Sequence, residues 1–357
     1  YIGTTYFIIG RAIIGLFSGP LYPSLHLLIA SYAPVRERTI LTVITHTGNI
    51  LGLSFNFGVG GYIVEHIPQG WKYLFIMNGV LGIFTLILWC IFIYSSPSEH
   101  PYMSQQEKTY ICGAENSTSY SHKMALKEIP FTSILLCPHV GIICLATFGG
   151  NLILYAQLTG HPKYLSSVFG ISKSMASYLS IIPFMCNFTF QIIYPFLFDY
   201  NRLSKWISKT TFRRLSAGIG FIGASIFLAP VGFVPCNQMA ISISMVTMSM
   251  VFLGANQSGS FTAIIDISPR FSGIIMGLAS TFGSLSGVLQ PQLASFLIKN
   301  GDRKEGYLLV FAITSLVSLL MGLPFILFGS AVEKEFTKKC VNHDEYEKIT
   351  LITNHKV

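Results

Sequence analysis

The amino-acid sequence predicts an all-α membrane protein that crosses the bilayer many times. Hydrophobic residues make up 51% of the 357 residues and charged residues only 11%, whereas a soluble domain carries about 25% charged residues. The mean hydropathy of +0.58 points the same way. A backbone inside lipid must satisfy its own hydrogen bonds, and apolar runs of about 20 residues do so as helices.

Nine apolar runs are long enough to be membrane-spanning helices. They lie at about 3–33, 40–64, 72–95, 138–160, 171–196, 212–234, 238–262, 271–298 and 307–330. The longest polar interruption, 96–137, separates three spans from six. We therefore expect a cytosolic linker at 96–137 between two helical bundles, 1–95 and 138–330. The charged segment 331–357 is predicted to be a cytosolic tail.

Positive charge predicts the side of the membrane on which each loop lies, because cytosolic loops are enriched in Lys and Arg. When the loops alternate between the two sides, sixteen of the 23 Lys and Arg residues fall on the side that holds 96–137 and the tail. That side is therefore predicted to be cytosolic. The same asymmetry accounts for the net charge of +8, so we expect a lipid bilayer, and no nucleic acid, as a partner.

The first span combines an arginine with a stripe of small residues. In RAIIGLFSGPLYPSLHLLIA, the residues Arg11, Gly15, Gly19 and Pro23 recur every four positions, and each step turns only about 40° around a helix. An arginine inside a span costs about 3 kcal/mol, so its side chain must face protein or water. We expect Arg11 to attract an anionic substrate. A structural arginine that pairs with a neighbouring helix is the alternative.

Further polar residues and glycines extend this pattern to other spans. Tyr22 returns to nearly the same helix face as Arg11, and His26 follows four residues later. Both side chains have a simpler alternative role, which is to complete hydrogen bonds between helices. Glycine-rich runs elsewhere contain Gly48, Gly52, Gly283 and Gly287. Such runs let helices pack closely and rock around a polar cavity, and intramembrane amides such as Asn49 are consistent with one.

Enzyme signatures are missing from the sequence. It contains no GxSxG, HExxH or P-loop motif, and the nine histidines have no ligand spacing. We therefore expect no enzyme activity, no cofactor and no metal site.

Taken together, these motifs resemble the anion:cation symporter family of the major facilitator superfamily, which includes sialin, the vesicular glutamate transporters and the sodium–phosphate cotransporters. The matching run places an arginine, GxxxG, Tyr-Pro, a histidine, Ala-Pro and Glu-Arg within residues 11–38, and it is followed by TTFRRL, DISPRFSGIIMGLASTFGSLSGVLQP and FGSAVEKE. The resemblance covers nearly the whole chain. It implies a major facilitator fold in which this chain holds helices 4–12 of twelve.

The resemblance and the polar pattern together suggest roles for individual residues. Substrate would be bound by Arg11, Tyr22, Asn151 and Tyr155; ion coupling or polar support would come from His26, Asn49 and Asp266; and a cytosolic gate would be formed by Asp199 and Arg202. The implied partners are a small anion and a coupling ion, H⁺ or Na⁺. The implied location is a lysosomal, vesicular or plasma membrane.

Some positions depart from the family pattern. The family commonly has a glutamate implicated in proton coupling where this chain has Ser18, and the glutamate branch has an arginine where this chain has Gly150. Asn151 suits the sialin-like branch better. We therefore expect a secondary active transporter of an anion of the sialic acid, acidic amino acid, urate or phosphate class, working by alternating access. A degenerate, non-transporting paralogue with an interaction or sensing role is the alternative.

Overall fold

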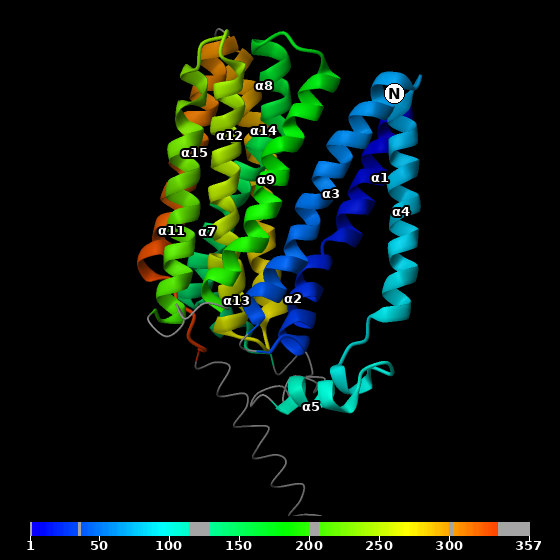
Figure 1. Ribbon diagram of the computed structural model, residues 1–357, viewed down its shortest axis with the longest axis vertical. Helices are drawn as coiled ribbons and strands as arrows, with labels where there is room; N and C mark the ends of the chain where they lie inside the picture. The colour runs from blue at the N-terminus through cyan, green and yellow to red at the C-terminus, as the bar shows by residue number, and fades with distance from the viewer. Residues whose placement is uncertain (1, 35–36, 114–128, 200–206, 300–302, 335–357) are drawn as a thin grey trace, which may run out of the picture.

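The computed structural model describes residues 2–34, 37–113, 129–199, 207–299 and 303–334, and every regular element in these ranges is helical (Figure 1). This confirms the all-α prediction. The first group of helices comprises α1 (Ile2–Ser18), α2 (Leu21–Tyr32), α3 (Arg38–His66) and α4 (Gly70–Phe92). It is followed by three short elements, η1 (Pro97–Glu99), α5 (Gln105–Gly113) and α6 (Phe131–Leu135).

The second group of helices is larger and contains two helices that are extended by π-helical turns. Its elements are α7 (Pro138–Tyr155), the π turn η3 (Ala156–Gly160), α8 (His161–Val168), α9 (Lys173–Asp199), α11 (Lys209–Leu228), η4 (Ala229–Phe233), α12 (Met239–Asn256), the π turn η5 (Gln257–Phe261), α13 (Thr262–Ile267), α14 (Ser272–Lys299) and α15 (Arg303–Phe328). The π turns η3 and η5 continue α7 and α12 without a break and lead into α8 and α13.

The first predicted span corresponds to one candidate membrane span, Thr4–Tyr32, which is built from two consecutive helices. α1 ends at Ser18 and α2 begins at Leu21, and Pro20 is the N-cap of α2. Proline has no backbone N–H to donate, so it interrupts a helix but is tolerated in a first turn, where N–H groups lack partners anyway. Pro23 lies in that same first turn. At this break the Gly19 amide still donates to the Gly15 carbonyl over 3.1 Å, and the Ser24 amide donates to the Pro20 carbonyl over 3.0 Å.

Eight helical segments of the described chain are long and apolar enough to cross a membrane, which supports the prediction of a multi-pass integral membrane protein. The predicted span 40–64 corresponds to α3, which is 29 residues long but is not one of the eight. Its sequence carries threonines, His46, Asn49 and Asn56, which lower its hydropathy. α3 packs along α9, so part of its surface is covered by protein.

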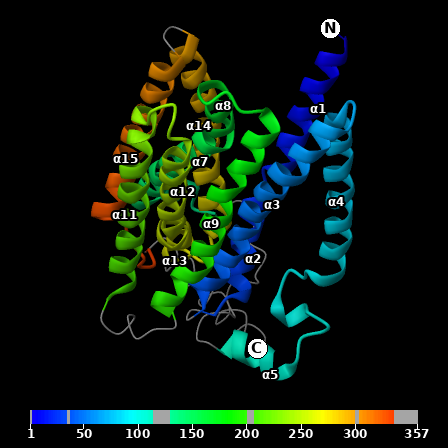
Figure 2. The same cartoon turned by 45° about the horizontal axis from the view of Figure 1, so that its top comes forward.

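The two groups stand side by side and meet through α2 and α3 (Figures 1 and 2). α3 packs along α9, and α2 packs against α14. By contrast, α1 is exposed from Thr4 to Ser18 except at the half-buried Gly10, and the one buried residue of α4 is Gly70. The joint between the groups is therefore built mainly from four helices.

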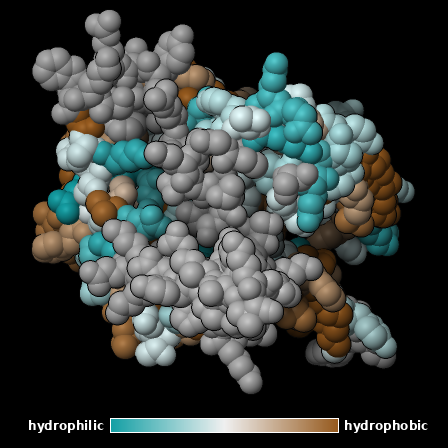
Figure 3. All heavy atoms as spheres, turned by 90° about the horizontal axis from the view of Figure 1, so that it is seen from below, coloured by the Kyte–Doolittle hydropathy of each residue, from teal (hydrophilic) through white to brown (hydrophobic). Residues whose placement is uncertain are grey.

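The longest described connection, residues 93–113 with η1 and α5, lies at one end of the molecule, which we call the α5 end; the opposite end, where α8 lies, is the α8 end (Figure 1). At the α5 end, the Tyr110 hydroxyl donates a hydrogen bond to Glu37 Oε1 over 3.0 Å, and the Lys334 amide donates to the Ile267 carbonyl over 3.0 Å. Viewed from this end, hydrophilic residues are visible across the face, and many of the hydrophobic residues lie at its edges (Figure 3). That distribution is expected where a membrane protein leaves the lipid.

Candidate functional site

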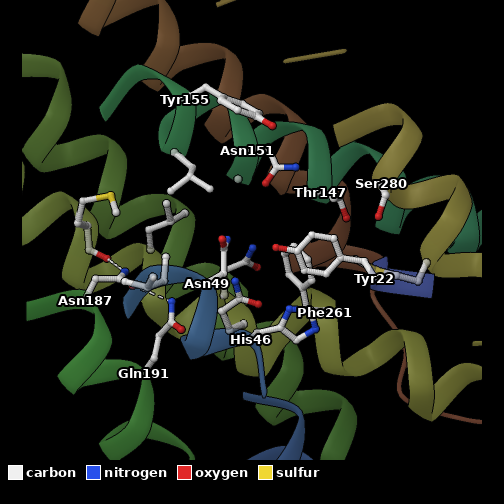
Figure 4. A pocket seen from close by; sticks show the side chains of 18 of the residues that line it. Tyr22, His46, Asn49, Thr147, Asn151, Tyr155, Asn187, Gln191, Phe261 and Ser280 are labelled. Atoms are coloured by element: carbon white, nitrogen blue, oxygen red, sulfur yellow. Dashed lines mark hydrogen bonds between the residues drawn. The ribbon is translucent and has the colours of Figure 1, made fainter. Parts of the chain in front are cut away.

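A cavity of about 160 Å³ lies at the joint between the two groups of helices (Figure 4). The first group contributes residues of α2 and α3 to its wall. The second group contributes residues of α7, α9, α12, η5 and α14. Both groups therefore enclose the cavity. We refer to this cavity below as the central pocket.

Neutral polar side chains dominate the wall of the central pocket. Six are amides, namely Asn49, Asn151, Asn187, Gln191, Asn256 and Gln257. Five are hydroxyls, namely Tyr22, Thr147, Tyr155, Ser280 and Ser284. Among the described residues that line it, none is Asp, Glu, Lys or Arg, and the one histidine is His46. The pocket thus offers many hydrogen bonds and no fixed charge.

Some of these polar groups are held by neighbours, and others have no partner. Asn187 donates to the backbone carbonyl of Met250 and accepts a 2.7 Å hydrogen bond from Gln191 Nε2. In the described structure, Gln191 Oε1, Gln257 Oε1 and Ser280 Oγ are buried without a hydrogen-bond partner. Buried polar atoms are almost always paired, so unpaired ones in a pocket wall suit a polar ligand or water.

Close packing of α7 on α14 sets the position of two pocket side chains. Asn151 lies over Gly283, and the ring of Tyr155 lies over Gly287, where a Cβ would come within 2.8 Å of the ring Cζ. A larger residue at either glycine would displace the side chain that lies over it. Tyr155 also immediately precedes the π turn η3, and Gln257 opens the π turn η5. π turns occur frequently at functional sites.

The structure brings four of the predicted site residues to the central pocket, namely Tyr22, Asn49, Asn151 and Tyr155. It does not bring Arg11 there. Arg11 is exposed in an apolar groove between α1 and α4, which it shares with Lys72 and several aromatic residues. Arg11 precedes Tyr22 by eleven positions, a separation that would be about 16 Å along the axis of an unbroken helix.

His26 lies behind the pocket and contacts a residue that the sequence analysis missed. Its Nε2 is 3.0 Å from Nε2 of His46, and both side chains are buried. The His46 ring stacks on Tyr22, with ring centroids 5.5 Å apart and an interplanar angle of 3°. The available signal was modest: His46 lies three residues before Asn49, on the same face of α3.

Asp266 takes part in a buried ion cluster at the α5 end. Its Oδ2 accepts from Arg213 at 2.9 Å, and its Oδ1 is 3.8 Å from Arg38 Nη1. Arg213 also donates to the Ser258 carbonyl over 2.7 Å and to Thr39 Oγ1 over 3.1 Å. Because Arg38 and Thr39 belong to α3, this cluster joins the two groups of helices.

Two other groups of predicted residues are placed as follows. The side chains of the expected gate pair, Asp199 and Arg202, lie outside the described residues. Of the expected packing positions, Pro23 contacts Gly273, with its carbonyl oxygen 3.0 Å from where a Cβ would stand. A Cβ at Gly15, Gly48 or Gly52 would meet no described atom within 4 Å, and one at Gly19 would meet only its own helix.

Comparison with known proteins identifies similar sequences over most of the chain. The profile of the Major Facilitator Superfamily matches residues 2–291. The chain is 29% identical to sialin of Homo sapiens over 323 residues, 30% identical to vesicular glutamate transporter 3 of Danio rerio over 340, and 27% identical over 329 to a protein of Drosophila melanogaster named for inorganic phosphate cotransport. These matches cover 90%, 94% and 90% of this chain. The chain spans 63%, 56% and 60% of the lengths of the three relatives.

Proposed function

Because this chain belongs to the Major Facilitator Superfamily, we propose that it takes part in secondary active transport of a small anion by alternating access around the central pocket. The observation that carries the proposal is the pocket itself, whose wall is shared between two groups of helices. A site at such a joint is exposed to one side or the other when the groups rock against each other. The α5 end would face the cytosol, because Lys and Arg are concentrated there.

The anionic nature of the substrate is supported by the relatives. One is named sialin, and the other two are named for glutamate transport and for inorganic phosphate cotransport; each match covers at least 90% of this chain. Amide and hydroxyl donors can bind carboxylate or phosphate oxygens. Tyr22, Asn151 and Tyr155 would supply such donors, and Asn49 would support them from α3.

Arg11 would act at a distance from the pocket in the conformation described here. Its exposed guanidinium lies on α1, the helix that leads into α2 and Tyr22. The field of a fixed positive charge on a helix that leads to the site raises the local concentration of anions. We expect Arg11→Ala to abolish most transport with normal expression, and Arg11→Lys to retain part of it. Lys163→Ala is the control, because Lys163 is an exposed cation on α8 that lines neither this groove nor the central pocket.

The direct test of the proposal is uptake into proteoliposomes that contain the full-length protein. Labelled sialic acid, glutamate, urate and phosphate would be offered separately, with and without gradients of H⁺ and Na⁺. Concentrative uptake of any one of them supports the proposal and identifies the class. Absence of uptake for all four would contradict it and favour a non-transporting paralogue.

A further inference from the structure

The His26–His46 pair has the geometry of a shared proton site. With Nε2 to Nε2 at 3.0 Å, one ring must donate and the other must accept. His26 is fully buried, and within the described structure its Nδ1 has no hydrogen-bond partner. A neutral pair holds two ring protons for four ring nitrogens, so the arrangement has room for one more proton.

The surroundings of the pair contain few other charges. α2 contributes Tyr22 and no Asp, Glu, Lys or Arg, and η5 contributes Phe261 at 5.6 Å from the His46 ring. α7 and α12 likewise carry no Asp, Glu, Lys or Arg, although α7 places Tyr155 in the pocket. No described neighbour of the pair on these four elements can therefore neutralise a proton that the pair takes up.

The other helices packed against α2 and α3 carry fixed charges only at or near their ends, namely Lys173 and Asp199 on α9, Asp266 on α13, Lys299 on α14 and Lys72 on α4. On α3, Arg38 precedes His46 by eight residues, about 12 Å along the axis, and Glu65 follows it by nineteen. Arg38 and Arg213 are both directed to Asp266. Arg270 is buried in the loop that leads into α14. Of these side chains, none that the structure describes lines the central pocket.

We propose that His26 and His46 together bind one proton, and that this proton provides the positive charge with which the central pocket holds its anion. The inference rests on the proposed function and specifies its coupling ion as H⁺. It follows from the two features above: the described wall has no fixed cation, and its one ionisable nitrogen base, His46, is bonded to a second buried imidazole.

The coupling cycle balances as a simple proton transfer. A proton from solvent adds to a free ring nitrogen, so the neutral pair becomes a cation with three ring protons. The anion then enters the pocket beside this cation, and both are released together on the other side, which returns the pair to neutrality. A buried cation without the anion is unfavourable, and so is the anion in an uncharged pocket, so each ligand favours binding of the other.

The pair is also placed where a change in its charge can affect the joint between the groups. His26 lies on α2, and its carbonyl accepts a 3.3 Å hydrogen bond from Ser272 Oγ of α14. His46 lies on α3 and contacts Phe261 of η5. Proton binding therefore occurs at contacts that must change when the groups rock.

The test compares His46→Gln and His26→Gln with His161→Gln in the full-length protein. His161 is an equally buried imidazole that bonds Ser180 and does not line the pocket, so it is a matched control. Uptake of the four labelled anions would be measured from pH 5.5 to 7.5, together with proton entry reported by a trapped dye. The midpoint of thermal unfolding of the purified protein, with and without each anion, would be measured at pH 5.5 and at pH 7.5.

For wild type and His161→Gln, we expect anion uptake to fall about tenfold per pH unit once the pair is mostly neutral, because one proton is bound per cycle. Proton entry should accompany the anion one to one for a monoanion. Stabilisation by the anion should be seen at pH 5.5 and not at 7.5, and His46→Gln and His26→Gln should lose both responses.

The outcomes separate the two proposals. Transport that is independent of pH, or that is unchanged in His46→Gln, would overturn the proton site and leave anion transport standing. Acid-dependent stabilisation by an anion that is lost in His46→Gln, without uptake of any anion, would support the proton site and overturn transport. If the protein neither transports nor is stabilised by any of the four anions, both proposals fall.

Discussion

The two groups of helices are joined at two places that differ sharply in chemistry. At the α5 end, Arg38 and Arg213 converge on Asp266, and all three side chains are buried. In the middle of the molecule, the same two groups enclose a pocket whose described wall has amides and hydroxyls but no fixed charge. The first joint is filled with its own ions, whereas the second has unpaired polar atoms and free volume.

The same two groups of helices thus meet through a buried ion cluster at one end and through a neutral polar pocket in the middle. A buried ion pair is stable when both partners are present and strongly unfavourable when one is removed. The α5 end is thus expected to behave as a latch whose parts depend on each other. Neutral amides tolerate loss of a neighbour better, so the pocket can be empty or occupied without disrupting the fold.

Among the substitutions that test this contrast, we expect Arg213→Leu to cause the largest loss of stability. The substitution leaves Asp266 with the more distant Arg38 and removes the donors to the Ser258 carbonyl and Thr39. Loss of one partner of a buried ion pair costs about 3–5 kcal/mol. Thermal unfolding in detergent should show a large drop in the midpoint.

The neighbouring Arg214 provides the control for that experiment. It is half-buried and donates one 2.7 Å hydrogen bond to the Gly329 carbonyl. Arg214→Leu should cost about 1 kcal/mol, the usual net value of a hydrogen bond. Equal losses for the two variants would show that the cluster is not a special joint.

An intermediate effect is expected from Asn151→Leu in the central pocket. The change removes amide hydrogen bonds from the wall, so uptake of the anion should fall about 10- to 100-fold, equivalent to about 1.5–3 kcal/mol for a bond to a charged group. The midpoint of thermal unfolding should change little. Asn56→Leu is the control, since Asn56 bonds Asn78 outside the pocket and should leave uptake nearly intact.

We expect the smallest loss of stability from Thr39→Val, which tests a single hydrogen bond of the ion cluster. It removes the hydroxyl that accepts a 3.1 Å hydrogen bond from Arg213 while keeping the side-chain shape. We expect a loss of about 1 kcal/mol in the free energy of unfolding. Thr45→Val on the exposed side of the same helix should change it by less than about 0.5 kcal/mol, and a Thr39→Val loss no larger than this would contradict the assigned contact.

The sequence was sufficient for the fold class because length and apolarity are local properties. The all-α, multi-pass prediction and the superfamily are confirmed, and relatives named as sialin and as a vesicular glutamate transporter agree with the anion:cation symporter type. The division of the first span was also readable in principle, since Gly19-Pro20 interrupts a helix. The apolar run continues through Gly19-Pro20, so hydropathy alone does not reveal a boundary between two helices there.

The candidate site was less accessible from the sequence, because it depends on which segments meet. Tyr22, Asn151 and Tyr155 were selected by resemblance, and the structure does place them at one pocket. His46 was missed because a histidine in a span looks the same whether it faces lipid or another imidazole. The partners of Asp266 lie 53 and 228 positions before it, a pairing that a single sequence does not reveal.

The π turns that follow α7 and α12 affect how related sequences should be compared. A π turn holds about one residue more than an α-helical turn, and one residue corresponds to about 100° of rotation. Deleting a single residue from Ala156–Gly160 would rotate α8 by that amount relative to Asn151 and Tyr155. Relatives that lack the extra residue would therefore present a different face of α8 to their neighbours, even where every aligned pocket letter is the same.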